Sequence, residues 1–233
     1  MVSVIFSWFR FCRPFTPYGM IRTIRNVGLL MFLSVNAALA QQVTIAALGD
    51  SLTQGYGLPL DDGFVPQLED WLNERGAEVT IINAGVSGDT TAGGLSRIEW
   101  TLTPEIDALI VALGGNDLLR GIDPELSRSN IEGILKVTSN RELPVLLVGM
   151  DAPSNYGAEF ETAFDAIYPE LSETYGTLLY PNFLGALAKQ DDRKAALLEY
   201  MQPDGIHPNS EGVSLIVGSI GPHVMELVNL VRD

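Results

Sequence analysis

Short runs of apolar, β-branched residues recur along the chain and alternate with amphipathic segments. The runs occupy residues 44–48, 79–83, 108–113, 145–150 and 178–180. None of them alternates polar with apolar residues, so both faces of each predicted strand are expected to be buried. Helical periodicity and capping residues predict helices between them, at 65–74, 92–102, 124–140, 160–175, 193–200 and 210–231. Buried strands separated by helices favour an α/β fold, a parallel sheet of about five strands with helices on both faces.

The first 40 residues differ from the rest and read as an export signal. Residues 20–25 are basic, residues 27–35 are apolar, and Ala38-Leu39-Ala40 matches a cleavage site. The apolar run is shorter than the roughly 20 residues that span a bilayer, so we expect removal after Ala40 and no stable membrane anchor. Residues 1–19 precede this pattern, and Met20 is the better candidate for the true start. The predicted location is the periplasm or the exterior of a bacterial cell.

Composition narrows the possible partners of the remaining chain, which we interpret as one domain over residues 41–233. It holds 10 basic and 29 acidic groups, because four of the 14 basic residues lie in the leader, and its net charge is −19. Such a charge disfavours nucleic acid as a partner. The only cysteine, Cys12, lies in the leader, and two histidines without cysteine make a zinc site improbable. We expect a monomer that needs no metal or organic cofactor.

Serine and histidine motifs lie at opposite ends of this domain. Ser51 follows the first predicted strand in Gly49-Asp50-Ser51-Leu52, where a strand-end loop leaves a hydroxyl accessible. His207 follows Asp204 by three residues, a spacing that lets the carboxylate hold Nδ1 while Nε2 faces a serine. The other histidine, His223, lies within the last predicted helix and is interpreted as structural. Ser51, Asp204 and His207 are therefore the candidate nucleophile, orienting acid and base.

Two further motifs follow predicted strands and offer hydrogen-bond donors. Gly88 lies in Ser87-Gly88-Asp89-Thr90, and Asn116 lies in Gly114-Gly115-Asn116-Asp117. A glycine amide and an asparagine side chain are typical donors of an oxyanion hole. Each motif alone would also be explained by an ordinary turn, but four such motifs at strand ends or helix starts make that explanation poor. We expect Asp50, Asp89 and Asp117 to bind loop backbones rather than to act chemically.

These four motifs, together with Asn155-Tyr156-Gly157, resemble those of the SGNH, or GDSL-type, hydrolases, from about residue 44 to the C-terminus. The resemblance is strongest to bacterial periplasmic arylesterases and thioesterase/lysophospholipases. It implies a three-layer α/β/α sandwich of flavodoxin-like type. It also implies a catalytic triad of Ser51, Asp204 and His207, and an oxyanion hole formed by Ser51, Gly88 and Asn116.

The predicted activity is hydrolysis of small-molecule aryl or acyl esters through an acyl-enzyme, with acyl thioesters and lysophospholipids as further candidate substrates. Four residues of the loops after Asn116 and near residue 156 are candidates for an acyl groove, although loop packing would explain them equally well: Leu118, Leu119, Ile122 and Tyr156. Two alternatives remain open at this point. The chain would be an acyltransferase to a sugar or alcohol, or a periplasmic binding module without turnover.

Overall fold

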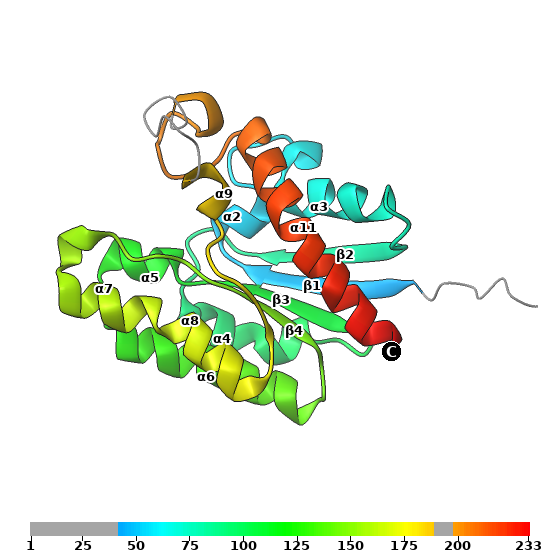
Figure 1. Ribbon diagram of the computed structural model, residues 1–233, viewed down its shortest axis with the longest axis horizontal. Coiled ribbons are helices and arrows are strands. Elements are labelled where there is room, and N and C mark those ends of the chain that lie inside the picture. Colours follow the sequence, from blue (N-terminus) through cyan, green and yellow to red (C-terminus); the bar gives the residue numbers. More distant parts are fainter. Residues whose placement is uncertain (1–41, 189–197) are drawn as a thin grey trace, which may run out of the picture. The chain divides into compact units, whose positions relative to one another are not determined.

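A computed structural model of the chain describes residues 42–188 and 198–233. The predicted leader, residues 1–40, lies outside the described residues, as does most of the helix predicted at 193–200. Parallel strands form one sheet in the order β2-β1-β3-β4-β5 (Figure 1). The strands are β1 (Val43–Gly49), β2 (Val79–Gly85), β3 (Ala108–Ala112), β4 (Val145–Val148) and β5 (Leu178–Tyr180).

The strand order creates a crevice at one edge of the sheet. The chain starts in β1, moves outward to β2, and then returns to place β3 on the other side of β1. Where the chain connections from neighbouring strands run to opposite sides of the sheet, a crevice opens beyond the carboxyl ends of those strands. This crevice is the usual ligand site of such sheets. Gly49 is in register with both Gly85 and Ala112, so β1, β2 and β3 end at the same level. The loops that carry the three strand-end motifs therefore begin together.

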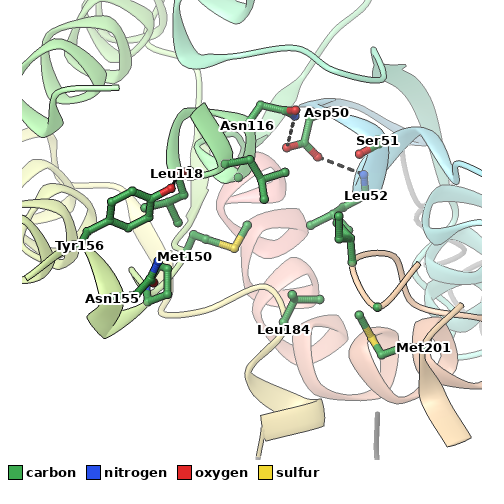
Figure 2. A pocket seen from close by; sticks show the side chains of 15 residues that line it. Asp50, Ser51, Leu52, Asn116, Leu118, Met150, Asn155, Tyr156, Leu184 and Met201 are labelled. Atoms are coloured by element: carbon green, nitrogen blue, oxygen red, sulfur yellow. Dashed lines mark hydrogen bonds between the residues drawn. The ribbon is translucent and has the colours of Figure 1, made fainter. Parts of the chain in front are cut away.

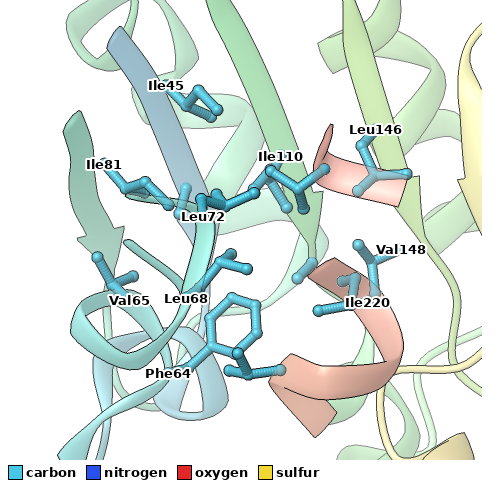
Figure 3. Close-up of a cluster of buried hydrophobic side chains, with 14 of the residues drawn as sticks. Ile45, Phe64, Val65, Leu68, Leu72, Ile81, Ile110, Leu146, Val148 and Ile220 are labelled. Carbon is cyan, nitrogen blue, oxygen red and sulfur yellow. The ribbon is translucent and has the colours of Figure 1, made fainter. Parts of the chain in front are cut away.

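Helices cover both faces of the sheet (Figure 1), but the expectation that every strand is buried on both faces was wrong for the edge strand β2, where Ile82 and Asn83 are exposed. On one face lie α3 (Phe64–Asn73) and α11 (Ser210–Arg232), whose buried side chains form one apolar cluster with the sheet. Figure 3 shows Phe64, Leu68 and Leu72 of α3 directed toward Ile110 of the sheet and Ile220 of α11. The other face carries α4 (Thr91–Thr101), α6 (Pro124–Asn140) and α8 (Ile167–Tyr175). The predicted α/β sandwich is confirmed.

The last helix, α11, is long and apolar enough to cross a membrane by length and hydropathy alone. Its residues Ile216, Ile220 and Val224 are fully buried, and the helix packs against α3 and the sheet. These contacts are typical of a core helix, because an apolar stripe that faces a sheet is already shielded from water. The structure thus accounts for the hydropathy of this segment without a membrane.

The helix predicted at 160–175 is two helices, and this prediction was wrong in that respect. α7 (Ala158–Asp165) ends before α8 begins at Ile167, and Pro169 lies in the first turn of α8. Proline is tolerated in a first turn because the N–H groups there have no partner within the helix, so Pro169 favours a new start. Short elements were also missed, since they are too short to show periodicity: α2 (Ser51–Gln54), α5 (Gly115–Arg120), α9 (Gly185–Ala188), and the 3₁₀ turns η1 (Leu60–Asp62) and η2 (Ser154–Tyr156).

Candidate active site

Ser51 is the first residue of the short helix α2, directly beyond the end of β1. The Asp50 side chain caps this helix by accepting a hydrogen bond from the Leu52 N–H at 3.0 Å. Gly85 at the end of β2 allows the turn to lie close to the sheet, because a Cβ at that position would lie 2.4 Å from the Gln54 nitrogen. The half-buried Ser51 is thereby held at the carboxyl edge of the sheet.

His207 and Asp204 approach Ser51 from a loop that precedes α11. The distance from His207 Nε2 to Ser51 Oγ is 2.9 Å, and the distance from His207 Nδ1 to Asp204 Oδ2 is 2.6 Å. The other carboxylate oxygen, Oδ1, accepts hydrogen bonds from the Ile206 and His207 N–H groups at 2.9 and 3.0 Å. The His207 hydrogen bond, with these backbone donors, lowers the pKa of Asp204 to about 2. An ionised Asp204 keeps the Nδ1 proton on its own side, so Nε2 is free to accept a proton from Ser51.

Two residues that support His207 were not identified from the sequence. The Tyr56 ring lies against the imidazole, with ring centroids 4.7 Å apart. Gln202 Nε2 donates to the carbonyl oxygens of Tyr56 at 2.8 Å and Pro208 at 3.0 Å, and so joins the histidine loop to the segment after α2. The available signal was Gly55-Tyr56-Gly57, a tight turn that follows the serine closely in the sequence.

Asn116 lies in the first turn of α5, beside the residue that precedes the serine. Its Nδ2 donates to Asp50 Oδ2 at 3.3 Å, and the carboxamide has a second hydrogen to offer a ligand. Burial raises the pKa of Asp50 to about 6, against the effect of its hydrogen bonds to Leu52 and Asn116. Asp50 therefore binds one backbone N–H, as expected, and also a side chain of the candidate site.

Gly88 lies in the exposed loop between β2 and α4, with φ of +81°. Its carbonyl oxygen accepts a hydrogen bond from Arg120 Nη2 at 2.7 Å, which places the loop against the end of α5. The structure thus brings Gly88 toward the helix that carries Asn116. Gly88 is not one of the residues that line the pocket beside Ser51 and Asn116.

Asp89 and Asp117 both bind side chains of neighbouring elements. Asp117 is fully buried and accepts from the Thr91 N–H at 2.9 Å, the Thr91 hydroxyl at 2.6 Å and the Ser127 hydroxyl at 3.0 Å. Asp89 pairs with Arg97 at 2.7 Å, and that guanidinium also donates to two backbone carbonyls at the ends of β1 and β2. The expectation of backbone contacts therefore holds in part for Asp117, through the Thr91 N–H, and was wrong for Asp89, whose carboxylate binds the Arg97 side chain.

A pocket of about 440 Å³ opens beside Ser51 and Asn116 (Figure 2). Of the four residues predicted for an acyl groove, Leu118, Leu119 and Tyr156 line it, and Ile122 does not. The sequence did not reveal the rest of the apolar wall, which comes from distant segments: Met150, Pro153, Leu184, Met201 and Ile206. In Figure 2, Leu118 and Tyr156 lie on one side of the pocket and Met201 on the other. The pocket is suited to an apolar group attached to a reacting centre at Ser51.

The described residues contain no cluster of three or more His, Cys, Asp or Glu side chains placed to hold a metal ion. His223 lies far along α11, where its ring contacts Tyr180 with centroids 5.1 Å apart. The residues that meet at the site offer a hydroxyl, an imidazole, a carboxylate and an amide donor.

Comparison with known proteins supports this interpretation. Residues 47–215 match the model of the GDSL-like lipase/acylhydrolase family. An arylesterase of Vibrio mimicus is 35% identical over 81% of this chain and 91% of its own. Thioesterase 1/protease 1/lysophospholipase L1 of Escherichia coli K12 is 33% identical over 86% of this chain and 91% of its own.

Solved structures give the same result. The crystal structure of AlinE4, an SGNH-hydrolase family esterase, is 44% identical, covers 80% of this chain and 96% of its own, and has a TM-score of 0.65. The predicted resemblance and the predicted enzyme class, a carboxylic ester hydrolase, are confirmed, and neither the acyltransferase nor the binding module is favoured. The chain belongs to the GDSL-like lipase/acylhydrolase family.

Proposed function

We propose that this serine esterase uses Ser51 as its nucleophile, His207 as the general base and Asp204 as the residue that orients the imidazole. The observation that carries the proposal is the unbroken relay from Ser51 Oγ through His207 to Asp204, with heavy-atom distances of 2.9 and 2.6 Å. The Ser51–His207 distance lies within the hydrogen-bond reach of a general base, and the His207–Asp204 distance is that of a hydrogen bond that orients the imidazole. Two loops separated by most of the chain meet to form this relay.

In the proposed reaction, Ser51 Oγ forms a bond to the acyl carbon while its proton passes to His207 Nε2. The negative oxygen that develops is held by N–H groups of Ser51, Gly88 and Asn116. When the bond to the leaving oxygen breaks, His207 returns the proton to that oxygen and an acyl-enzyme remains. His207 then takes a proton from water, whose oxygen bonds to the acyl carbon. As the bond from that carbon to Ser51 Oγ breaks, His207 returns the proton to Oγ, so the carboxylic acid leaves and the Ser51 hydroxyl is restored. No electron transfer is involved in either half.

The proposed substrates are neutral esters with an apolar acyl chain. The wall formed by Leu118, Met150 and Leu184 offers that chain a surface of low polarity next to Ser51. A net charge of −19 over residues 41–233 disfavours polyanionic substrates such as acyl-CoA relative to neutral aryl and alkyl esters. The arylesterase name of the Vibrio mimicus relative agrees with this preference.

A series of p-nitrophenyl esters tests both parts of the proposal. Ser51→Ala should abolish turnover with unchanged circular dichroism. The control Ser96→Ala, which alters an exposed hydroxyl on α4, should retain it. Each added methylene buried in the pocket is worth about 0.8 kcal/mol, so kcat/KM should rise up to about fourfold per methylene until the pocket is full. Retained activity in Ser51→Ala refutes the nucleophile, and a flat series refutes the acyl pocket.

We also propose that the enzyme is exported as a soluble protein that spans residues 41–233. The support is the basic and apolar pattern of residues 20–40, with its cleavage site after Ala40. N-terminal sequencing of the protein from the periplasm or medium should begin at Gln41. A mature protein that keeps residues 1–40, or one that remains in the membrane fraction, contradicts the proposal.

A further inference from the structure

We propose that Arg120 is a positioning residue that aims the Gly88 N–H at the reacting carbonyl. The inference rests on the proposed oxyanion role of Gly88. Arg120 closes α5 and donates from Nη2 to the Gly88 carbonyl oxygen at 2.7 Å, across a sequence separation of 32 residues. The side chain lies at the surface, so its bond to the loop is not imposed by burial in the core.

The Gly88 loop depends on such an external restraint because of its own geometry. Gly88 has φ of +81° and is exposed, and glycine has the widest choice of backbone angles of any residue. The peptide unit after Gly88 is held at both ends. Its N–H, from Asp89, donates to the Val86 carbonyl at 3.0 Å, and its C=O is held by Arg120. The bond from Asp89 to Val86 closes a turn around the preceding peptide, which carries the Gly88 N–H, and this closure limits the direction in which that N–H points.

Arg120 also connects the loop to the second proposed donor. Asn116 and Arg120 are four residues apart on α5, a spacing that places both on one face of the helix. The helix is itself held in place, because Asp117 binds Thr91 and Ser127 below it, and the Tyr156 hydroxyl donates to the Leu118 carbonyl at 2.6 Å. Gly88 and Asn116 are therefore fixed to the same rigid piece, so their N–H groups keep one relative orientation.

Arginine suits this role through its shape as well as its charge. The planar guanidinium presents several donors in a fixed geometry, and lysine keeps the charge on a single flexible ammonium. A field effect of the cation on the oxyanion would be screened by salt, whereas a short hydrogen bond that sets backbone geometry would not. This difference lets an experiment separate the two origins of any rate effect.

The test compares Arg120→Met, Arg120→Lys and a control, Arg141→Met. Arg141 makes the same kind of bond elsewhere, from Nη1 to the Leu102 carbonyl at 2.7 Å at the ends of α4 and α6. Loss of one oxyanion donor costs about 10²–10³ in kcat, so a donor that is only misaimed should cost about 10- to 100-fold in Arg120→Met. KM should stay within about twofold, Arg120→Lys should recover part of the rate, and Arg141→Met should match wild type.

A second readout separates positioning from a merely structural role. The affinity of an alkylboronic acid, whose tetrahedral adduct with Ser51 occupies the oxyanion hole, should fall in Arg120→Met by the same factor as kcat/KM. An unchanged kcat, a loss only of thermal stability, or a rate defect that disappears in about 1 M salt would each overturn the proposal.

Labelling of Ser51 by a fluorophosphonate in the wild-type enzyme identifies which hypothesis has failed. Without labelling, the proposed function is wrong. With labelling and a fully active Arg120→Met, only the role of Arg120 is wrong.

Discussion

Replacement of Thr91 by valine removes one hydroxyl from the buried contact between α4 and α5 and nearly preserves the shape of the side chain. That hydroxyl donates to Asp117 Oδ1 at 2.6 Å and accepts from Asn130 Nδ2 at 3.0 Å. Both Thr91 and Asp117 are completely buried, so water cannot replace the lost partner. A hydrogen bond to a charged group contributes about 1.5–3 kcal/mol, and a buried acceptor left short of a donor costs its desolvation as well. We expect the free energy of unfolding to fall by about 2–3 kcal/mol.

Urea denaturation followed by circular dichroism measures the change in the free energy of unfolding. In thermal unfolding, a domain of this size should lose about 5–10 °C in Tm. The control is Thr174→Val, which removes an exposed hydroxyl bonded to the Glu170 carbonyl within α8 and should change stability by less than about 0.5 kcal/mol. Equal stability of Thr91→Val and wild type would refute the conclusion that Asp117 joins the two helices through this hydroxyl.

Two further predictions concern the site itself. Asn116→Ala should lower kcat by about 10²–10³ for a p-nitrophenyl ester, and an unchanged kcat contradicts its role as a donor. A carbon NMR titration should give Asp50 a pKa of about 6, and a midpoint at or below the ordinary 3.8 contradicts its burial. Because the pKa of Asp50 is higher in the fold than in the unfolded chain, its stabilising contribution is complete below pH 3.8 and is lost as pH rises through about 6.

The sheet and its main helices could be predicted from the sequence because their signals are local. The run at 108–113 has no polar residue before Gly114, which identifies a doubly buried strand, and β3 is buried throughout. Asp123 followed by Pro124 marks the start of α6, and the observed helix has the predicted bounds of 124–140. The split at Pro169 was missed because apolar periodicity continues across it. The signal of such a restart is the proline, which fixes the backbone, and not the pattern of apolar side chains.

The motif residues of the site were also predictable, since the carboxyl ends of parallel strands share one edge of a sheet. The residues that surround these motifs could not be predicted from the sequence. Arg120, Tyr56 and Gln202 act through contacts between segments that are distant in the sequence, and no local pattern specifies those contacts. The pocket wall has the same origin, because Leu184 and Met201 reach it from separate segments before and after the last stretch of undescribed chain.

The pairing of Ser51 with His207 is the central claim, and the rate of phosphonylation by a fluorophosphonate tests it most directly. Peptide mass spectrometry should find the adduct on Ser51, and His207→Ala should slow its formation by at least about 10²-fold, the lower range for general base catalysis. An adduct on another residue, or equal rates in the wild-type enzyme and His207→Ala, would contradict the claim.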